Sequence, residues 1–163
     1  VAFVVAGCGI PVAKHGNKAI SSRSGSADVL RELGVNIDAE KKIMEQALND
    51  ANICFMMAAK YHNAMKYVAP VRQELGIRSI FNILGPLSNP ANAPYQLIGV
   101  YSRDLIVKMA MVLSSLGSKK AWIVHGNDGL DEITTTDITH VAQLKDGQVS
   151  TFTINPEDLA LKL

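Results

Sequence analysis

The sequence has little of what several classes of protein require. Aromatic residues make up only 6% of it, so the rows of stacking side chains that bind single-stranded nucleic acid are not expected. Its charges nearly cancel, with sixteen lysines and arginines against fifteen aspartates and glutamates. That balance leaves no basic footprint for nucleic acid or a membrane surface. No apolar run is long enough to span a bilayer.

Cysteine is also scarce. The two cysteines, Cys8 and Cys54, are too few for a disulfide framework and have no cysteine or histidine at metal-ligand spacing. We therefore predict two reduced, buried thiols in a cytoplasmic protein. The apolar start at residues 1–6 has no basic segment before it, so it is a poor signal peptide and is interpreted as a buried strand.

Apolar residues are plentiful enough to form a core. They make up 48% of the 163 residues, which is the size of one ordinary domain. Their spacing alternates between strand-like and helix-like. Strands are expected at residues 2–6, 53–57, 96–101 and 121–124, and helices at residues 27–33, 39–50 and 103–116.

The remaining segments complete the expected fold. Residues 62–75 predict one or two short helices, with Pro70 as a break or a first helical residue. Residues 77–90 are expected to be irregular, and residues 138–154 predict a hairpin that turns at Asp146-Gly147. Asp38 is the expected N-cap of the helix at 39–50. The pattern predicts a single α/β domain over residues 1–163, mostly parallel sheet flanked by helices, with a late hairpin.

The first candidate site covers residues 14–18 and 21–28, before the N-terminus of an expected helix. Backbone N–H groups at such a terminus, together with small hydroxyl side chains, bind anions. Lys14, Lys18 and Arg23 add positive charge. The segment matches neither G-x-x-x-x-G-K-[ST] nor G-x-G-x-x-G, so a phosphate site and a plain surface loop are both compatible with it.

The second candidate site is the loop at residues 125–132, after another expected strand. It carries Asp128, Asp131 and Glu132, and carboxylate oxygens suit Mg²⁺. The adjacent Asp131 and Glu132 could hold a magnesium–diphosphate cluster. The alternative is a solvated acidic turn, since acidic loops are common.

Two further segments and three histidines complete the candidates. Arg72 would bind a carboxylate through two parallel hydrogen bonds if it faces a cleft, although a lone arginine is usually a surface residue. Residues 81–90 contain rigid Gly/Pro turns and carry no obvious chemistry. His62 and His125 are interpreted as structural or substrate-adjacent, and His140 as lying on a strand's surface. No catalytic residue is assigned, because the sequence contains no G-x-S-x-G motif.

Taken together, these segments resemble anthranilate phosphoribosyltransferase. The resemblance rests on Lys14-His15-Gly16-Asn17 leading into residues 24–28, on residues 71–78, on residues 81–90 with L-G-P-L-x-N-P, and on Asp131-Glu132. These segments occur in the family's order and spacing and span almost the whole chain. The pairing of L-G-P-L-x-N-P with K-H-G-N is the specific part of the match.

The resemblance implies an activity and its setting. The expected reaction transfers the phosphoribosyl group from phosphoribosyl diphosphate to the amine of anthranilate, releasing diphosphate, in tryptophan biosynthesis. The enzyme would be a magnesium-dependent, cytoplasmic glycosyltransferase (a pentosyltransferase), homodimeric as a whole protein, with no nucleic-acid or membrane partner. The implied fold is the α/β catalytic domain of the nucleoside phosphorylase and phosphoribosyltransferase type. The family's small N-terminal helical domain is absent from this chain.

Five residues would bind the substrates if the family's sites are carried onto this sequence. Lys14 and Ser26 would contact phosphoribosyl diphosphate. Asn17 and Arg72 would hold anthranilate, Arg72 through the carboxylate. His15 would line the anthranilate channel.

The family's metal site would fall on Asp131 and Glu132. The sequence departs from the family at two other places. The thirteen residues before Lys14 match neither the family's G-T-G-G-D loop nor its N-x-S-T segment, and Ala59 stands where the family commonly has proline. We therefore expect the chain alone, as a fragment of the catalytic domain, to be inactive.

Two other functions are compatible with parts of the pattern. One is a nucleic-acid-binding paralogue without transferase activity, which the near-neutral charge argues against. The other is a pyrimidine nucleoside phosphorylase on the same fold, which would lack Arg72 in its carboxylate role.

Overall fold

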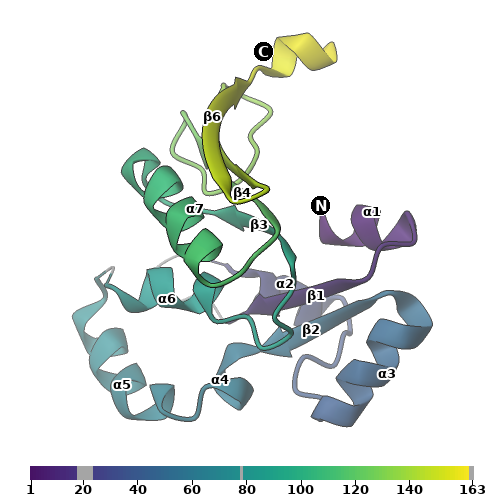
Figure 1. The fold of residues 1–163 in the computed structure, drawn as a ribbon. Helices are drawn as coiled ribbons and strands as arrows, with labels where there is room; N and C mark the ends of the chain where they lie inside the picture. The colour runs from purple at the N-terminus through teal and green to yellow at the C-terminus, as the bar shows by residue number, and fades with distance from the viewer. Residues whose placement is uncertain (18–23, 78, 162–163) are drawn as a thin grey trace. The chain divides into compact units, whose positions relative to one another are not determined.

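The computed structural model describes residues 1–17, 24–77 and 79–161 (Figure 1). The chain divides into two compact units, Val1–Ala91 and Asn92–Leu163, which are described in turn. Within the described ranges, no helix combines the length and the apolar character needed to cross a membrane.

The first unit is built on two parallel strands, β1 (Val12–Gly16) and β2 (Ile53–Met57). They pair from Val12 with Ile53 to Gly16 with Met57. Parallel strands need a long crossover between them, and this one contains α2 (Ser26–Glu32) and α3 (Lys41–Ala51). In Figure 1 the two strands run side by side, and α3 lies next to β2.

The two faces of this strand pair pack into separate clusters. On one face, Phe55 and Met57 pack with the residues of α2 and the turn after it, Ala27, Leu30 and Ile37. On the other face, Cys54 and Met56 pack with Met44 of α3. Neighbouring residues of a strand point to opposite faces, so β2 contributes alternate side chains to the two clusters.

Short helices make up the rest of the first unit. They are α1 (Ala2–Gly7), α4 (Ala58–Tyr61), α5 (Met65–Leu75) and α6 (Phe81–Leu87). The turn into α6 is stabilised by Asn82, whose side-chain oxygen accepts a hydrogen bond from the Ser79 N–H at 2.9 Å. After α6, the Asn89 amide donates to the carbonyl oxygen of Ala13 in β1 at 3.1 Å. The segment at residues 81–90 is therefore attached to the first strand.

The second unit is a four-stranded sheet in the order β3 (Tyr95–Gly99), β4 (Lys120–Gly126), β5 (Thr139–Lys145) and β6 (Gln148–Ile154). A 3-10 turn, η1 (Arg103–Leu105), leads into α7 (Ile106–Ser115), which packs on β4, β5 and β6. Trp122 and Phe152 meet edge to face, with ring centroids 5.3 Å apart. A second 3-10 turn, η2 (Pro156–Leu159), follows β6.

Several expectations are confirmed. The α/β class is correct, and β5 and β6 form the late hairpin around Asp146-Gly147. The sheets are mixed: β1–β2 and β3–β4 are parallel, whereas β4–β5 and β5–β6 are antiparallel.

Other expectations are wrong for local reasons. Residues 2–6 form the helix α1, because a short run of apolar residues has no period that separates helix from strand. Residues 77–90 contain the helix α6 despite Gly85 and Pro86. Pro70 lies inside α5, where the missing N–H costs one helical hydrogen bond.

Three single residues also differ from expectation. Asp38 does not cap α3, whose N-cap is Glu40; it pairs instead with Arg31 at 3.0 Å. Cys54 is buried as predicted, but Cys8 is exposed. His140 is 7% exposed, so it is a core histidine, and burial lowers its pKa.

Candidate functional site

Lys14 and His15 lie in the strand β1, although the sequence indicated a loop. The segment has no apolar run, and its parallel pairing with β2 overrides the weak local preference for strand. Lys14 is paired with Phe55 and His15 with Met56. Because Phe55 and Met56 belong to different clusters, Lys14 points to the face covered by α2, and His15 points to the opposite face.

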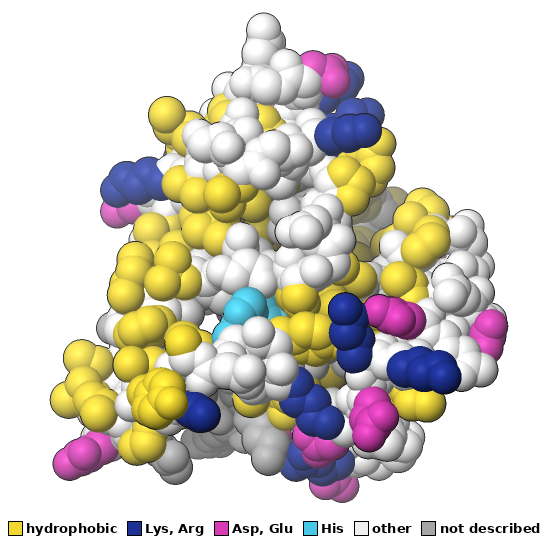
Figure 2. Space-filling view, turned by 60° about the horizontal axis from the view of Figure 1, so that its bottom comes forward, with side chains coloured by type: hydrophobic (Ala, Val, Ile, Leu, Met, Phe, Trp, Pro, Cys, Tyr) yellow, Lys and Arg dark blue, Asp and Glu magenta, His cyan; other side chains and the backbone are white. Residues whose placement is uncertain are grey.

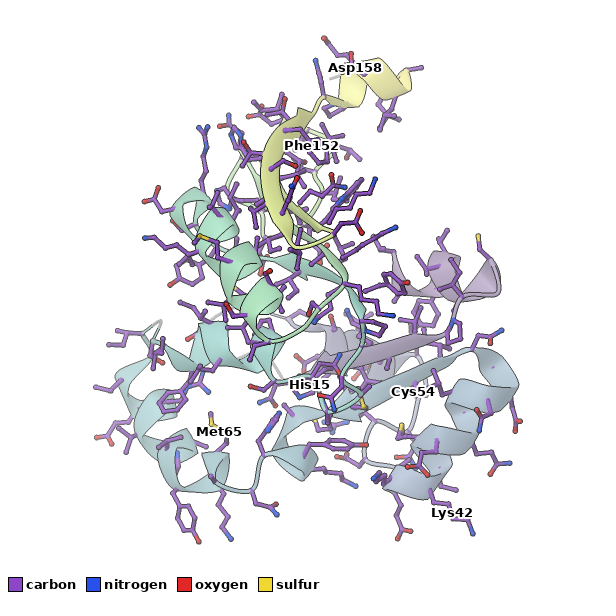
Figure 3. All side chains as sticks on the ribbon, in the orientation of Figure 1. His15, Lys42, Cys54, Met65, Phe152 and Asp158 are labelled. Carbon is purple, nitrogen blue, oxygen red and sulfur yellow. The ribbon has the colours of Figure 1, made fainter. Side chains whose placement is uncertain are left out.

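His15 forms a pair with His62, which follows α4. Their Nε2 atoms are 3.2 Å apart, and the rings meet edge to face with centroids 5.0 Å apart. Figure 3 places His15 where β1 runs beside β2. Histidine atoms reach the surface among hydrophobic and uncharged atoms in Figure 2, and both members of the pair are partly exposed. Spacing along the sequence could not reveal this pair, because 47 residues separate its members.

The surroundings of His15 favour its neutral form. Burial lowers its pKa below the ordinary value of 6.5, and His62 lowers it further. A hydrogen bond to the carbonyl of Gly85 acts in the opposite direction. A neutral imidazole has a single N–H. If His15 gives that N–H to Gly85, its Nε2 atom accepts a hydrogen bond from His62.

Arg72 lies on α5 and its guanidinium stands over the ring of Phe81, 5.3 Å from the ring centroid. This is the distance of a cation–π contact. Residues 81–90 therefore contact two elements of the first unit: α5 at Arg72, and β1 at both His15 and Ala13. The sequence pointed to a structured segment here but not to this connecting role.

The other predicted phosphate ligands lie around the start of α2. Ser26 is the first residue of this helix and is exposed. The carboxylate of Asp28 accepts a hydrogen bond from the N–H of Gly25 at 2.9 Å, which caps the helix. Asn17 directly follows β1 and is exposed. Other predicted residues lie outside the described ranges: Lys18, Ser21, Ser22, Arg23 and Arg78.

The acidic candidate loop of the second unit is organised by Asp128. Its Oδ2 atom accepts hydrogen bonds from the hydroxyls of Thr134 and Thr136, the latter at 2.6 Å. Its Oδ1 atom accepts a hydrogen bond from the Leu130 N–H at 3.1 Å. The two threonine hydroxyls and this N–H lower the pKa of the Asp128 carboxyl. Both oxygens of Asp128 thus accept hydrogen bonds from its own loop, one at Oδ1 and two at Oδ2.

Asp131 and Glu132 are exposed, and among the described residues neither belongs to an ion pair. No three His, Cys, Asp or Glu side chains in the described ranges gather as ligands for one metal. Magnesium commonly takes one or two carboxylates, substrate phosphates and water. Two adjacent exposed carboxylates are hard oxygen donors that fit this mode of binding.

The backbone beside these carboxylates packs tightly. The carbonyl oxygen of Asp131 would be 1.6 Å from a Cβ placed on Gly99, at the end of β3. Only glycine permits this approach. His125, at the end of β4, faces the carbonyl oxygen of Val100 with its Nδ1 atom at 2.8 Å, which favours its structural interpretation.

A family model described as glycosyl transferase family, a/b domain, matches residues 1–163. The chain belongs to this glycosyl transferase family. The match covers both units of the chain.

Similar proteins within the glycosyl transferase family include the anthranilate phosphoribosyltransferase of Rhodospirillum rubrum. It is 56% identical over 162 residues, which are 99% of this chain and 47% of that protein. A crystal structure of anthranilate phosphoribosyltransferase from Thermus thermophilus matches with a TM-score of 0.83 and 41% identity, covering 99% of this chain and 47% of that one. The chain thus spans about half the length of the curated relatives it matches.

Two structures of the Saccharomyces cerevisiae enzyme also match this member of the glycosyl transferase family. The complex with phosphoribosyl diphosphate and Mg has a TM-score of 0.83 and 32% identity, covering 96% of this chain and 43% of that one. The complex with 4-fluoroanthranilate has a TM-score of 0.81 and 28% identity, covering 99% and 44%.

Proposed function

We propose that the protein carrying this chain transfers the phosphoribosyl group of phosphoribosyl diphosphate to the amine of anthranilate. The observation that carries this proposal is 56% identity, over 99% of the chain, to an anthranilate phosphoribosyltransferase. Neighbouring structures bind phosphoribosyl diphosphate with Mg and an anthranilate analogue. Neither a nucleic-acid-binding protein nor a pyrimidine nucleoside phosphorylase is favoured by these similarities.

The reaction exchanges one bond at C1 of the ribose. The C1–O bond to diphosphate breaks, and the lone pair of the anthranilate amine forms a C1–N bond. The nitrogen then releases one proton to water. An aromatic amine is already a nucleophile at neutral pH, so a strong base is not needed. The demanding steps are charge stabilisation on the leaving diphosphate and alignment of the amine with C1.

On this proposal, the first unit supplies side chains that contact both substrates, from β1, α2 and α5. Arg72 holds the anthranilate carboxylate with its planar guanidinium, and the cation–π contact with Phe81 orients it. His15 and Asn17 contact the same substrate. Lys14 and Ser26 contact phosphoribosyl diphosphate, for which a lysine point charge and a helix-start hydroxyl are suitable partners.

The histidine pair suits an aromatic substrate. A neutral His15 presents no full charge next to the anthranilate ring, and its lowered pKa keeps it neutral near pH 7. Its hydrogen bonds to His62 and Gly85 hold the ring plane in one orientation. His15 thus acts as a wall of the channel and not as a base.

Asp131 and Glu132 would hold Mg²⁺ at the diphosphate. The bound ion supplies charge neutralisation for the leaving group. The chain's own contribution is to keep two carboxylates exposed and adjacent on a loop whose backbone rests against Gly99.

We place this transferase in the cytoplasm, as a homodimer. Its phosphorylated substrate is multiply charged and does not cross a lipid bilayer unaided, so the enzyme works in the compartment that makes this substrate. Light scattering coupled to size-exclusion chromatography tests the dimer: a mass of one chain at micromolar concentration contradicts it.

The activity is tested directly with the purified protein that carries this chain. Incubation with anthranilate, phosphoribosyl diphosphate and MgCl₂ is expected to consume anthranilate and release one diphosphate per anthranilate. Mass spectrometry identifies the phosphoribosylated amine. Phosphorolysis of thymidine, with no loss of anthranilate, contradicts the proposal and favours the phosphorylase.

A further inference from the structure

The loop between β4 and β5 contains a carboxylate that faces inward to the loop itself. Asp128 accepts hydrogen bonds from two side-chain hydroxyls and one backbone N–H. All of these donors lie within eight residues of it in sequence. Oδ2 of Asp128 accepts from two hydroxyls and Oδ1 from one N–H, so the contacts of this carboxylate point to a task within the loop.

The contacts of Asp128 reach the buried part of the sheet. Thr134, one of its hydroxyl donors, is 4% exposed. The N–H of Thr134 donates to the hydroxyl of Thr139 at 3.0 Å, and Thr139 is fully buried at the start of β5. Buried polar groups need their partners, so this chain of hydrogen bonds anchors Asp128 to a fixed strand.

The contacts of Asp128 also fix the peptide that leads into Asp131. The Leu130 N–H donates to Asp128, and the Leu130 carbonyl accepts from the Gly126 N–H at 2.8 Å. Both polar groups of the residue before Asp131 are therefore bonded. The carbonyl of Asp131 itself lies against Gly99.

Gly126, the last residue of β4, allows this arrangement. A Cβ on Gly126 would lie 2.5 Å from Oδ1 of Asp128, 3.1 Å from Cγ2 of Thr134 and 3.3 Å from the carbonyl oxygen of Leu130. The loop folds back over the end of its own strand at this point. The close packing leaves the carboxylate little room to take another position.

We propose that Asp128 is a positioning residue, which orders the loop so that Asp131 and Glu132 are presented together to a magnesium–diphosphate ligand. This inference rests on the proposed function for the identity of that ligand. It predicts that Asp128 touches neither the metal nor the substrates and acts through Leu130, Thr134 and Thr136.

The test compares variants in the full-length protein. Asp128→Asn replaces one of the two acceptor oxygens with an NH₂ donor, so the hydroxyls and the Leu130 N–H can no longer all be satisfied. Thr136→Val removes one donor, and Thr136→Ser keeps it. Asp146→Asn is the matched control, because it removes the same charge from the exposed β5–β6 turn. The measurements are the magnesium concentration at half-maximal rate, the KM of anthranilate at saturating magnesium, and amide hydrogen exchange.

Asp128→Asn is expected to raise the half-saturating magnesium concentration by roughly tenfold, as loss of groups that orient metal ligands does. The KM of anthranilate should stay within about twofold of wild type. Thr136→Val should raise the half-saturating magnesium concentration less. Combining it with Asp128→Asn should give no further rise over Asp128→Asn alone, because both changes disrupt the same hydrogen bond. Thr136→Ser and Asp146→Asn should match wild type.

Hydrogen exchange separates this inference from the proposed function. Asp128→Asn should speed exchange of the Leu130 and Thr136 amides and leave the β4–β5 amides slow, whatever the substrate is. An unchanged magnesium requirement in an active Asp128→Asn enzyme overturns the positioning role alone. A wild-type protein with no magnesium-dependent transfer overturns the proposed function. If hydrogen exchange of the loop is also unchanged in Asp128→Asn, the ordering role of Asp128 is overturned as well.

Discussion

Single side chains of the first unit acquire their roles from partners that are distant in sequence. His15 is paired with His62 and bonded to Gly85, and Arg72 stands over Phe81. Each contact restricts a flexible or rotatable group before a ligand arrives. Such restriction lowers the entropy lost on binding, which on the proposed function would favour binding of the small, rigid anthranilate.

Arg72→Lys should raise the KM of anthranilate about 10- to 100-fold, because loss of a charge-assisted hydrogen bond costs about 1.5–3 kcal/mol. The kcat value at saturating anthranilate should change less. Steady-state kinetics with anthranilate as the varied substrate measures both. Arg31→Lys is the matched control, since Arg31 pairs with Asp38 on an exposed surface. Equal effects of the two changes on KM contradict the carboxylate role of Arg72.

The histidine pair predicts a pH dependence of stability. Because the folded state lowers the pKa of His15, the unfolded chain binds more protons in the range below pH 6.5. The free energy of unfolding therefore falls as the pH decreases through that range and is fully regained above it. Urea unfolding between pH 5 and pH 8 measures the slope.

His15→Gln should flatten that slope more than His62→Gln does. The first change removes the titrating group, whereas the second removes only the repulsion by His62 and leaves the larger effect of burial. A slope that is unchanged in His15→Gln shows that the pair is not the source of the pH dependence.

At the scale of elements, the segment at residues 81–90 connects the parts of the first unit. It combines α6 with a turn whose Asn89 holds the Ala13 carbonyl of β1. The second unit uses close backbone packing instead, at Gly99 and Gly126. The Asn89 hydrogen bond and the close packing at the two glycines both fix the position of a loop through backbone atoms. Substitutions far from any ligand can therefore still displace a residue of the candidate site.

Gly99→Ala should destabilise the second unit by about 1–3 kcal/mol, because the added methyl group overlaps the Asp131 carbonyl and forces backbone movement. It should also raise the magnesium requirement, since Asp131 moves with its carbonyl. Chemical denaturation and a magnesium titration measure the two effects. Gly7→Ala makes the same chemical change where no atom lies within 4 Å, and should have little effect. A stable Gly99→Ala protein with normal magnesium dependence contradicts the packing argument.

The elements predicted well from sequence are those with a strong local pattern. The β5–β6 hairpin has its turn residues and alternation, and α2, α3 and α7 have one apolar face each. The strand β1 was missed because its residues Lys14-His15-Gly16 are polar or small, and only the pairing with β2 makes them a strand. Pairing with a neighbouring strand, and not local sequence preference, determines the secondary structure of residues 12–16, as is common for strands.

The candidate site was predictable to a similar degree. Motif resemblance identified seven candidate ligands, and their roles stay predictions. It could not identify His62, Phe81 or Asn89 as partners, because a sequence does not display contacts across tens of residues. Composition also suggested Asp128 as a third acidic ligand, whereas hydroxyl groups eight residues away or closer already occupy it.

At the scale of the whole molecule, the net charge of +1 does not show how the charged residues proposed to bind ligands are distributed between the two units. The proposed substrate ligands Lys14 and Arg72 belong to the first unit, and the proposed metal ligands Asp131 and Glu132 belong to the second. A neutral total therefore says little about a protein whose ligands are small anions and a cation.

Removal of magnesium should abolish transfer and weaken the stabilisation that diphosphate provides. At a free ligand concentration of 100 times Kd, a bound ligand adds about 2.7 kcal/mol to the free energy of unfolding. Thermal unfolding with diphosphate and MgCl₂, compared with diphosphate and EDTA, measures this difference. Asp131→Asn combined with Glu132→Gln should remove it, and Asp146→Asn should preserve it. Stabilisation that survives EDTA contradicts a metal-dependent diphosphate site.

The register of β1 against β2 decides which face of the strand pair each neighbouring side chain points to. Lys14 and His15 are adjacent in sequence but point to opposite faces, so a slip of one residue would exchange them. The lysine would then face the cluster of Met56, and the histidine would face α2. On the proposed function, substrate selectivity is thus encoded partly in backbone pairing. A one-residue insertion within residues 12–16 should lower the proposed transferase activity more than substitution of either Lys14 or His15 does.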